Sequence, residues 1–273
     1  MARGDLARGA LKGLAAGADL LRRPPAGVVV LIYHRVGGGS GLQLDLAPDV
    51  FARQMDELAA AGNVVPLATA IRRLAGDDEV PGAPGVVLTF DDGTDDFADH
   101  ALPVLVERAL PVTCYVATAF VEEQRPFDHG ARPLSWGALA DACATGLVDV
   151  GSHTHTHRLL DRVDPAVAAD ELDRSVALIQ DRLGREVHDF AYPKAVAPAP
   201  GVERAVRARF RSAALAGTRA NRPGATDPHR LARSPVQAGD GMRWFRRKVA
   251  GGMRFEDDVR RLLNRARYAG RRT

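Results

Sequence analysis

Short apolar runs alternate with amphipathic helical patterns along most of this 273-residue chain. The apolar runs occupy residues 28–33, 86–90, 112–116, 148–151, 187–192 and 212–215. Helical patterns lie between them at residues 49–61, 96–109, 135–144, 165–183 and 202–210. Continuous apolar runs are typical of strands covered on both faces, and their alternation with helices is typical of a parallel sheet. The sequence therefore predicts an α/β fold whose sheet is closed, or nearly closed, into a barrel.

Residues with strong helix-boundary preferences mark several of these helices. Asp164 stands before a proline and is expected to be an N-cap, and Gly184 then ends the helix. Ser135 is a second expected N-cap. Pro103 lies inside the pattern 96–109, where it predicts a kink.

Length and composition fit one large globular domain. Hydrophobic residues make up 46% of the chain and charged residues 26%, which excludes a disordered or collagen-like protein. The length would allow two domains of about 150 residues each, but single α/β barrels commonly reach about 250 residues, so one large domain is equally permitted.

The net charge of +3 conceals an uneven distribution. Residues 1–25 carry a net +3 and residues 241–273 a net +8, whereas residues 26–240 carry a net −8. We therefore divide the chain into a basic N-terminal segment (1–25), a barrel region (26–240) and a basic C-terminal helical extension (241–273). Basic segments of this kind contact anionic membranes or are simply solvated, and both alternatives stay open. The net negative charge of the barrel region does not attract polyanions, so we expect no nucleic-acid partner.

The C-terminal extension interleaves apolar residues with arginines. The apolar positions are Phe245, Val249, Val259, Leu262, Leu263 and Tyr268. A basic amphipathic helix of this kind lies on an anionic membrane surface or packs back on the barrel.

Two features of the sequence indicate the cellular compartment of the protein: its cysteines and its lack of long apolar segments. Cys114 and Cys143 fit no disulfide or zinc-binding spacing, so we expect buried thiols in a reducing compartment. The N-terminal region lacks the apolar run of about 7–15 residues typical of a signal peptide. No run reaches the about 20 apolar residues of a transmembrane helix. We expect a cytoplasmic protein, with any membrane contact peripheral and at the inner membrane face.

Polar residues suited to chemistry directly follow four of the expected strands. They are His34 after the run 28–33, Asp91 and Asp92 after 86–90, the segment 153–157 after 148–151, and Tyr192, Pro193 and Lys194 at the end of 187–192. Barrels of this class collect their catalytic groups at the carboxyl ends of the strands. We therefore expect these residues to converge.

The sequence Asp91-Asp92-Gly93 supplies two adjacent carboxylates. Successive strand residues point to opposite faces, so both carboxylates reach one site only if the chain turns there, which Gly93 permits. One carboxylate can then bind a metal while the other takes a proton from water. An ordinary Asp-Gly turn with solvated acids is the alternative. The following acids Asp95, Asp96 and Asp99 are expected to be ordinary residues in the first turn of a helix.

Three histidines alternate with threonines at positions His153, His155 and His157. In a helix His153 and His157 share a face, whereas in a strand all three do. Imidazoles that converge with a carboxylate are typical of a site for zinc or a related divalent ion with an open position for water. The alternative is a surface cluster without metal. The remaining histidines, His100, His129, His188 and His229, are expected to be exposed or simply hydrogen-bonded.

These motifs resemble the polysaccharide deacetylase (NodB homology) family of carbohydrate esterases. The resemblance rests on Thr89-Phe90-Asp91-Asp92-Gly93, on the pattern His153-Thr154 with Thr156-His157, and on Phe190-Ala191-Tyr192-Pro193. Residues 32–36 and 230–233 resemble the permuted branch of the family, which includes poly-N-acetylglucosamine deacetylases. The resemblance covers roughly residues 28–250. It implies a single-domain, TIM-like, incomplete (β/α)7 barrel.

The resemblance also implies a role for each motif residue. Asp92, His153 and His157 would hold a divalent metal, with zinc the expected ion. Asp91 would be the general base, and His34 the general acid that protonates the leaving amine.

Two departures from the family pattern affect the remaining roles. Substrate and oxyanion would be bound with the help of Tyr192, Pro193 and Lys194, chiefly through the backbone N–H of Lys194. The first departure lies here, because the family usually has an aromatic residue and a glycine after the proline, where this chain has Lys194 and Ala195. Ala191 stands where many members have arginine. Arg233, or else Arg230, must then hold the general base Asp91 ionised and oriented.

The combined prediction is a metal-dependent hydrolase that removes N-acetyl groups from an N-acetylated amino sugar or polysaccharide. An acetamide is a poor electrophile with a poor leaving group, so its hydrolysis needs an activated water, a stabilised oxyanion and a proton for the amine. Two alternatives stay open. One is a deacylase of another linear amide or an O-acetyl ester on the same fold, and the other is a non-catalytic carbohydrate-binding protein.

Overall fold

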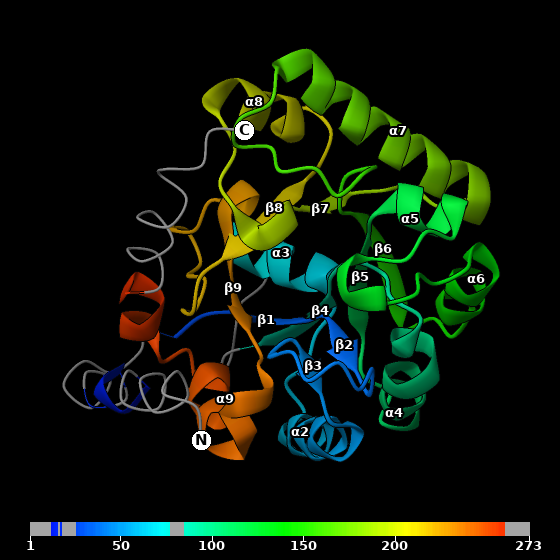
Figure 1. Cartoon of the computed structure of the whole chain (residues 1–273). Helices are drawn as coiled ribbons and strands as arrows, with labels where there is room; N and C mark the ends of the chain where they lie inside the picture. Colours follow the sequence, from blue (N-terminus) through cyan, green and yellow to red (C-terminus); the bar gives the residue numbers. More distant parts are fainter. Residues whose placement is uncertain (1–11, 16, 18–25, 77–84, 260–273) are drawn as a thin grey trace.

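Seven parallel strands form a closed barrel at the centre of the molecule (Figure 1). A computed structural model describes residues 12–15, 17, 26–76 and 85–259 of the chain. In barrel order the strands are β1 (Val29–Tyr33), β4 (Val86–Phe90), β5 (Val112–Val116), β6 (Val148–Ser152), β7 (Asp189–Ala191), β8 (Ser212–Ala216) and β9 (Leu231–Pro235). The predicted α/β barrel is therefore confirmed, and six of its strands lie within one or two residues of the apolar runs.

Helices lie in the connections between the strands and after the last strand (Figure 1). They are α2 (Pro48–Ala61), α3 (Leu67–Ala75), α4 (Leu102–Glu107), α5 (Thr118–Glu123), α6 (Trp136–Ala144), α7 (Pro165–Leu183), α8 (Pro200–Arg207) and α9 (Gly241–Val249). The expected caps are present, since Ser135 accepts from the Ala138 N–H and Asp164 from the Ala166 N–H. A small parallel pair, β2 (Arg35–Val36) with β3 (Asp45–Leu46), follows β1.

Most residues of the barrel strands are buried on both faces, as their continuous apolar character predicts. One set of alternate residues, including Val30 and Val87, packs inside the barrel against Leu67 and Ala70 of α3. The other set, including Leu31 and Leu88, packs outward against the surrounding helices. Helix α3 therefore closes the amino end of the barrel, which leaves the carboxyl end for the polar residues that follow the strands.

The helix expected at residues 96–109 has a different form in the structure. A π-helical turn, Phe97–Ala101, comes first and is followed by α4. Pro103 lies in the first turn of α4, where the lack of a backbone N–H costs little. The kink expected at Pro103 is thus replaced by a wider turn just before it.

Helix α9 of the C-terminal extension packs its apolar side chains on the barrel. The Phe245 side chain of α9 is 1% exposed and belongs to the outer core, and Val249 packs against that core. A membrane-facing role is therefore wrong for Phe245. The expected positions Leu262, Leu263 and Tyr268 lie outside the described residues, as do residues 1–11, 16 and 18–25 of the N-terminal segment. A membrane contact through the ends therefore stays a prediction. Within the described ranges, no helix is long and apolar enough to cross a membrane.

Candidate active site

A fully buried ion pair joins Asp91 to Arg233 at the carboxyl end of the barrel. Arg233 Nη1 donates to Asp91 Oδ1 at 2.6 Å and Nη2 donates to Oδ2 at 2.8 Å. Nη1 also donates to Thr89 Oγ1 at 3.1 Å, and Arg233 is 0% exposed. Burial alone would raise the pKa of Asp91, but the facing Arg233 charge, with further contributions from His153 and His34, leaves that pKa below its ordinary value. Asp91 is therefore an oriented, ionised carboxylate.

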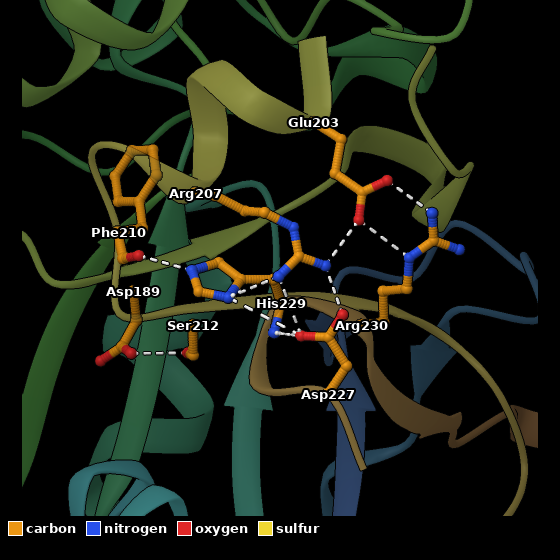
Figure 2. Close-up of polar contacts among 8 residues, drawn as sticks. All are labelled: Asp189, Glu203, Arg207, Phe210, Ser212, Asp227, His229 and Arg230. Atoms are coloured by element: carbon orange, nitrogen blue, oxygen red, sulfur yellow. Dashed lines mark hydrogen bonds and ion pairs between the residues drawn. The ribbon is translucent and has the colours of Figure 1, made fainter. Parts of the chain in front are cut away.

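The alternative arginine, Arg230, lies elsewhere in the molecule. Figure 2 shows it paired with Glu203 of α8, to which it donates from Nε at 2.9 Å. Glu203 also accepts from Arg207, which in turn contacts Asp227. The structure thus gives Arg233, and not Arg230, the contact with Asp91.

Asp92, His153 and His157 form a cluster beside this ion pair. Asp92 Oδ1 lies 3.5 Å from His153 Nε2 and 3.3 Å from His157 Nε2. The three candidate ligand atoms all lie within 4.8 Å of one another. Burial by itself would raise the pKa of Asp92, but the hydrogen bond from His157 and the nearby imidazoles lower it strongly. Burial lowers the pKa of His153 to about 4, so this imidazole is neutral and can donate a lone pair.

The donor set fits a divalent metal ion. Two imidazole nitrogens and one carboxylate oxygen are a common ligand set for zinc and related ions. His153 donates from Nδ1 to the Ala191 carbonyl at 2.7 Å, and this contact leaves Nε2 unprotonated and facing Asp92. The buried nitrogen is thus held in the tautomer that a metal ligand needs.

Backbone strain is concentrated around this cluster. Among the described residues, the non-glycine positions with a left-handed φ are Asp92, Ala109, Gln124, Thr154, His157, Lys194, Ala195 and Met253. Five of these eight stand in the three loops that follow β4, β6 and β7. Strained backbone of this kind persists where the surrounding structure enforces it, and it is common at functional sites. The turn that brings Asp92 to the site begins at Asp92 itself, with φ 74°, and continues at Gly93 with φ 85°.

His34 follows β1 and joins the same end of the barrel. Its ring lies close enough to help lower the pKa values of both Asp91 and Asp92. The ring is partly exposed, and its Nδ1 is buried without a hydrogen-bond partner among the described residues. The structure therefore brings His34, Asp91, Asp92, His153 and His157 together, as their positions at the strand ends predict, and it adds Arg233 from within β9.

The segment after β7 departs from expectation at Tyr192. The Tyr192 side chain is 1% exposed and packs edge-to-face on Phe190 in the outer core, so it points away from the site. Lys194 is exposed and has φ 51°. Its backbone N–H donates no hydrogen bond within the described part of the chain. Tyr192 can contribute only its backbone, whereas the Lys194 N–H is free to bind a ligand.

Several residues outside the sequence motifs support the histidine loop. Thr118 Oγ1 shares a hydrogen bond of 3.0 Å with His155 Nδ1, so His155 supports the loop from the α5 side. Glu171 and Ser175 of α7 bind the loop from the other side. Both are polar residues that stand four positions apart, next to the apolar face of their helix. This spacing is visible in the sequence and could have marked them as buried polar contacts. The acid Asp96 was also expected to be ordinary, yet it is buried and accepts from Arg35 at 2.6 Å.

His188, His229 and the two cysteines lie outside this site. His229 bonds to the Phe210 carbonyl, His188 pairs with exposed Glu186, and both cysteines are free and buried. The side chain of His129 lies outside the described part of the chain.

Fold and site together define an α/β-barrel protein with a candidate divalent-metal site at the carboxyl end of the strands. The polysaccharide deacetylase family model matches residues 78–212, which include the Asp91-Asp92 and histidine motifs. The matching region and the relatives below support a place for this chain in the polysaccharide deacetylase family.

Individual relatives agree with this assignment. A chitooligosaccharide deacetylase of Bradyrhizobium sp. (strain ANU 289) is 35% identical over 104 residues, which span 38% of this chain and 41% of that protein. The IcaB structure from Ammonifex degensii superposes with a TM-score of 0.71 at 29% identity, covering 81% of this chain and 98% of the other. The Streptococcus pyogenes deacetylase PplD, solved in complex with acetate, has the same fold, with a TM-score of 0.72 at 21% identity over 82% of this chain and 99% of the other.

Proposed function

We propose that this protein is a metal-dependent deacetylase that removes the N-acetyl group from an N-acetylated amino sugar in an oligosaccharide or polysaccharide. The observation that carries the proposal is the Asp92, His153 and His157 cluster next to the buried Asp91–Arg233 pair. This arrangement supplies a metal site and an adjacent ionised base, which amide hydrolysis requires. The similarity to a chitooligosaccharide deacetylase supports the sugar substrate.

Asp92, His153 and His157 would hold the metal, and zinc suits this set of two nitrogens and one oxygen. A divalent ion held there would polarise the acetamide carbonyl and lower the pKa of a bound water molecule. The chain's own contribution is to fix the ligand atoms, through the His153 contact to Ala191 and the left-handed turn at Asp92.

Asp91 is the proposed general base. Its two oxygens are held by Arg233, so the carboxylate stays ionised and cannot rotate away from its neighbours. A general base must carry a negative charge before the reaction and accept the proton of the attacking water. Arg233 keeps Asp91 in this state without touching the substrate, and is therefore a positioning residue.

His34 and Lys194 complete the proposed reaction. His34 donates a proton to the amine as the carbon–nitrogen bond breaks, because an unprotonated amide nitrogen is a poor leaving group. The free backbone N–H of Lys194, fixed by its left-handed conformation, donates to the oxygen that gains negative charge. Each such donor contributes about 3–4 kcal/mol to stabilisation of a tetrahedral oxyanion.

The test is acetate release from N-acetylglucosamine oligomers by the full chain, together with metal analysis of the same samples. We expect Asp91→Asn to lower the rate by about 10²–10⁴-fold while metal binding is retained. His153→Ala should lose both metal and activity. Asp99→Asn, at an exposed acid in the segment after β4, is the matched control and should behave as the wild type.

Assays with a panel of acetylated substrates test which type of bond the protein hydrolyses. Release from N-acetyl sugars and not from O-acetyl esters or other linear amides supports the proposal. Unchanged acetate release after the Asp91 and His153 substitutions would overturn it, and so would a purified protein that binds sugar but no metal.

A further inference from the structure

The two histidines of the candidate metal site are supported unequally. The His153 ring is fixed from behind by the Ala191 carbonyl at 2.7 Å, and the residue is 1% exposed. The His157 side chain is 22% exposed, and no hydrogen bond from another described residue supports its ring apart from the one to Asp92. Its backbone has φ 59°, a strained conformation for histidine. The position of His157 must therefore be enforced through the backbone next to it.

Glu171 of α7 holds that backbone. The Thr156 N–H donates to Glu171 Oε2 at 2.7 Å, and Thr156 Oγ1 donates to Glu171 Oε1 at 2.6 Å. Both carboxylate oxygens thus bind the residue directly before His157. Glu171 is 5% exposed, and the cation near it, Arg158, lies 3.8 Å away. A buried carboxylate needs strong hydrogen bonds, and here Thr156 provides them.

Ser175, one turn further along α7, holds the other end of the same loop. Its hydroxyl shares a hydrogen bond of 2.8 Å with Ser152, and Ser152 Oγ accepts from the Thr154 N–H at 3.3 Å. Glu171 and Ser175 are four residues apart, so they lie on the same side of the helix. A single rigid helix face therefore sets the spacing between the start and the end of the loop that carries His153 and His157.

We infer that Glu171 is a positioning residue that fixes His157 in ligand geometry by clamping Thr156 to α7. This inference rests on the proposed function, because it requires that Asp92, His153 and His157 bind a metal. Glu171 itself is not a ligand, since both of its oxygens are used by Thr156. Supporting groups behind metal ligands commonly change metal affinity by about 10–100-fold when they are removed.

The test measures zinc affinity of the metal-free full chain by competition with a chromophoric chelator. Glu171→Asp keeps the charge but is too short to reach both Thr156 groups, and we expect it to weaken zinc binding about tenfold or more. Glu171→Gln keeps the length, accepts from the Thr156 N–H and donates to its hydroxyl, so it should restore affinity to within a few-fold. Asp173→Ala removes an exposed α7 carboxylate paired with Arg209 and is the control, with unchanged affinity.

The outcomes separate this inference from the proposed function. A wild-type protein that binds no zinc overturns the proposed function and, with it, the inference. If the wild type binds zinc and Glu171→Asp binds it equally well, the inference alone is overturned. A merely structural role would lower the unfolding temperature of the metal-free protein and leave zinc affinity unchanged. If Glu171→Asp does not fold, Thr156→Val removes one of the two bonds, and unchanged zinc affinity in that variant also overturns the inference.

Discussion

Arg233 places a permanent positive charge inside the barrel, directly beside Asp91. Its guanidinium is bidentate to the carboxylate, and its Cζ lies 5.2 Å from the centre of the Tyr115 ring. Arginine is suited to this place because its planar fork matches a carboxylate and stays charged when buried. The pair is therefore both a structural contact and the means by which Asp91 remains ionised.

Replacement of Arg233 by methionine should strongly destabilise the protein. The change leaves Asp91 buried without its counter-charge, which typically costs about 3–5 kcal/mol. The pKa of Asp91 should rise, so the acid limb of the activity profile should move to higher pH. Urea unfolding of the metal-free protein and a rate profile against pH measure the two effects.

Arg230→Met is the matched control, because Arg230 is an exposed arginine with an ion pair to Glu203 (Figure 2). Exposed pairs contribute about 0–1 kcal/mol, so this variant should lose little stability. Equal losses in the two variants would contradict the role assigned to Arg233.

At the scale of elements, β6 contains a close steric contact inside the barrel. Gly151 of β6 lies against the Tyr115 ring of β5, and a Cβ at this position would meet Tyr115 Cδ1 at 2.5 Å and the Asp189 carbonyl oxygen at 2.8 Å. The pairing of β6 with β7 is also short, since it consists of Ser152 with Phe190. A glycine is thus required where two strands and a buried ring approach closely.

Gly151→Ala should destabilise the protein by about 1–3 kcal/mol, because an added methyl group overpacks the barrel interior. Thermal and urea unfolding measure this change. Gly137→Ala is the control in α6, where a Cβ would meet only Ser135 Oγ at 3.8 Å. Removal of a helical glycine should stabilise by about 0.5–1 kcal/mol. The same sign of change in both variants would contradict the steric explanation.

At the scale of the whole molecule, a buried charge cluster ties distant parts of the chain together. Asp240 accepts from Lys12, in the N-terminal segment, and from Lys248 of α9 at 2.6 Å. Lys248 also donates to the Pro235 carbonyl of β9 at 2.8 Å. The Asp240 and Lys248 side chains are 0% exposed, so both ends of the described chain are fixed to the barrel through one carboxylate.

Asp240→Asn should cost about 3–5 kcal/mol at neutral pH, because it removes the buried carboxylate that pairs with both Lys248 and Lys12. Asp258→Asn, which changes an exposed acid 3.9 Å from Arg254, is the control and should change stability by less than about 1 kcal/mol. Urea unfolding of the three proteins measures the differences. Equal stability of the wild type and Asp240→Asn at neutral pH would contradict the importance of this cluster.

The same cluster predicts a dependence on pH. Burial would raise the pKa of Asp240, but Lys248 and Lys12 bring it below its ordinary value. A carboxylate with a lowered pKa in the folded state stabilises the protein above its unfolded pKa of about 3.9, and this stabilisation is lost as the pH falls through the folded value. The difference in unfolding free energy between the wild type and Asp240→Asn should therefore shrink in acid. A difference that is constant from neutral pH into acid would refute this linkage.

The sequence by itself determined the barrel class and the main residues of its site. Apolar runs, helix caps at Ser135 and Asp164 and polar residues at strand ends are local signals, and each needs only a few neighbouring residues to be recognised. The convergence of His34, Asp92 and His153 followed from these signals, because strands of a parallel barrel all end on the same side.

Only the tertiary structure decided which partners these residues have. Arg233 stands 142 positions from Asp91, and its pairing depends on how β9 closes the barrel against β1. The outward direction of Tyr192, the clamp of Glu171 on Thr156 and the packing of Phe245 also depend on contacts between separate elements. Local patterns contain no information on such contacts, because strand register and helix docking are fixed only when the whole core packs.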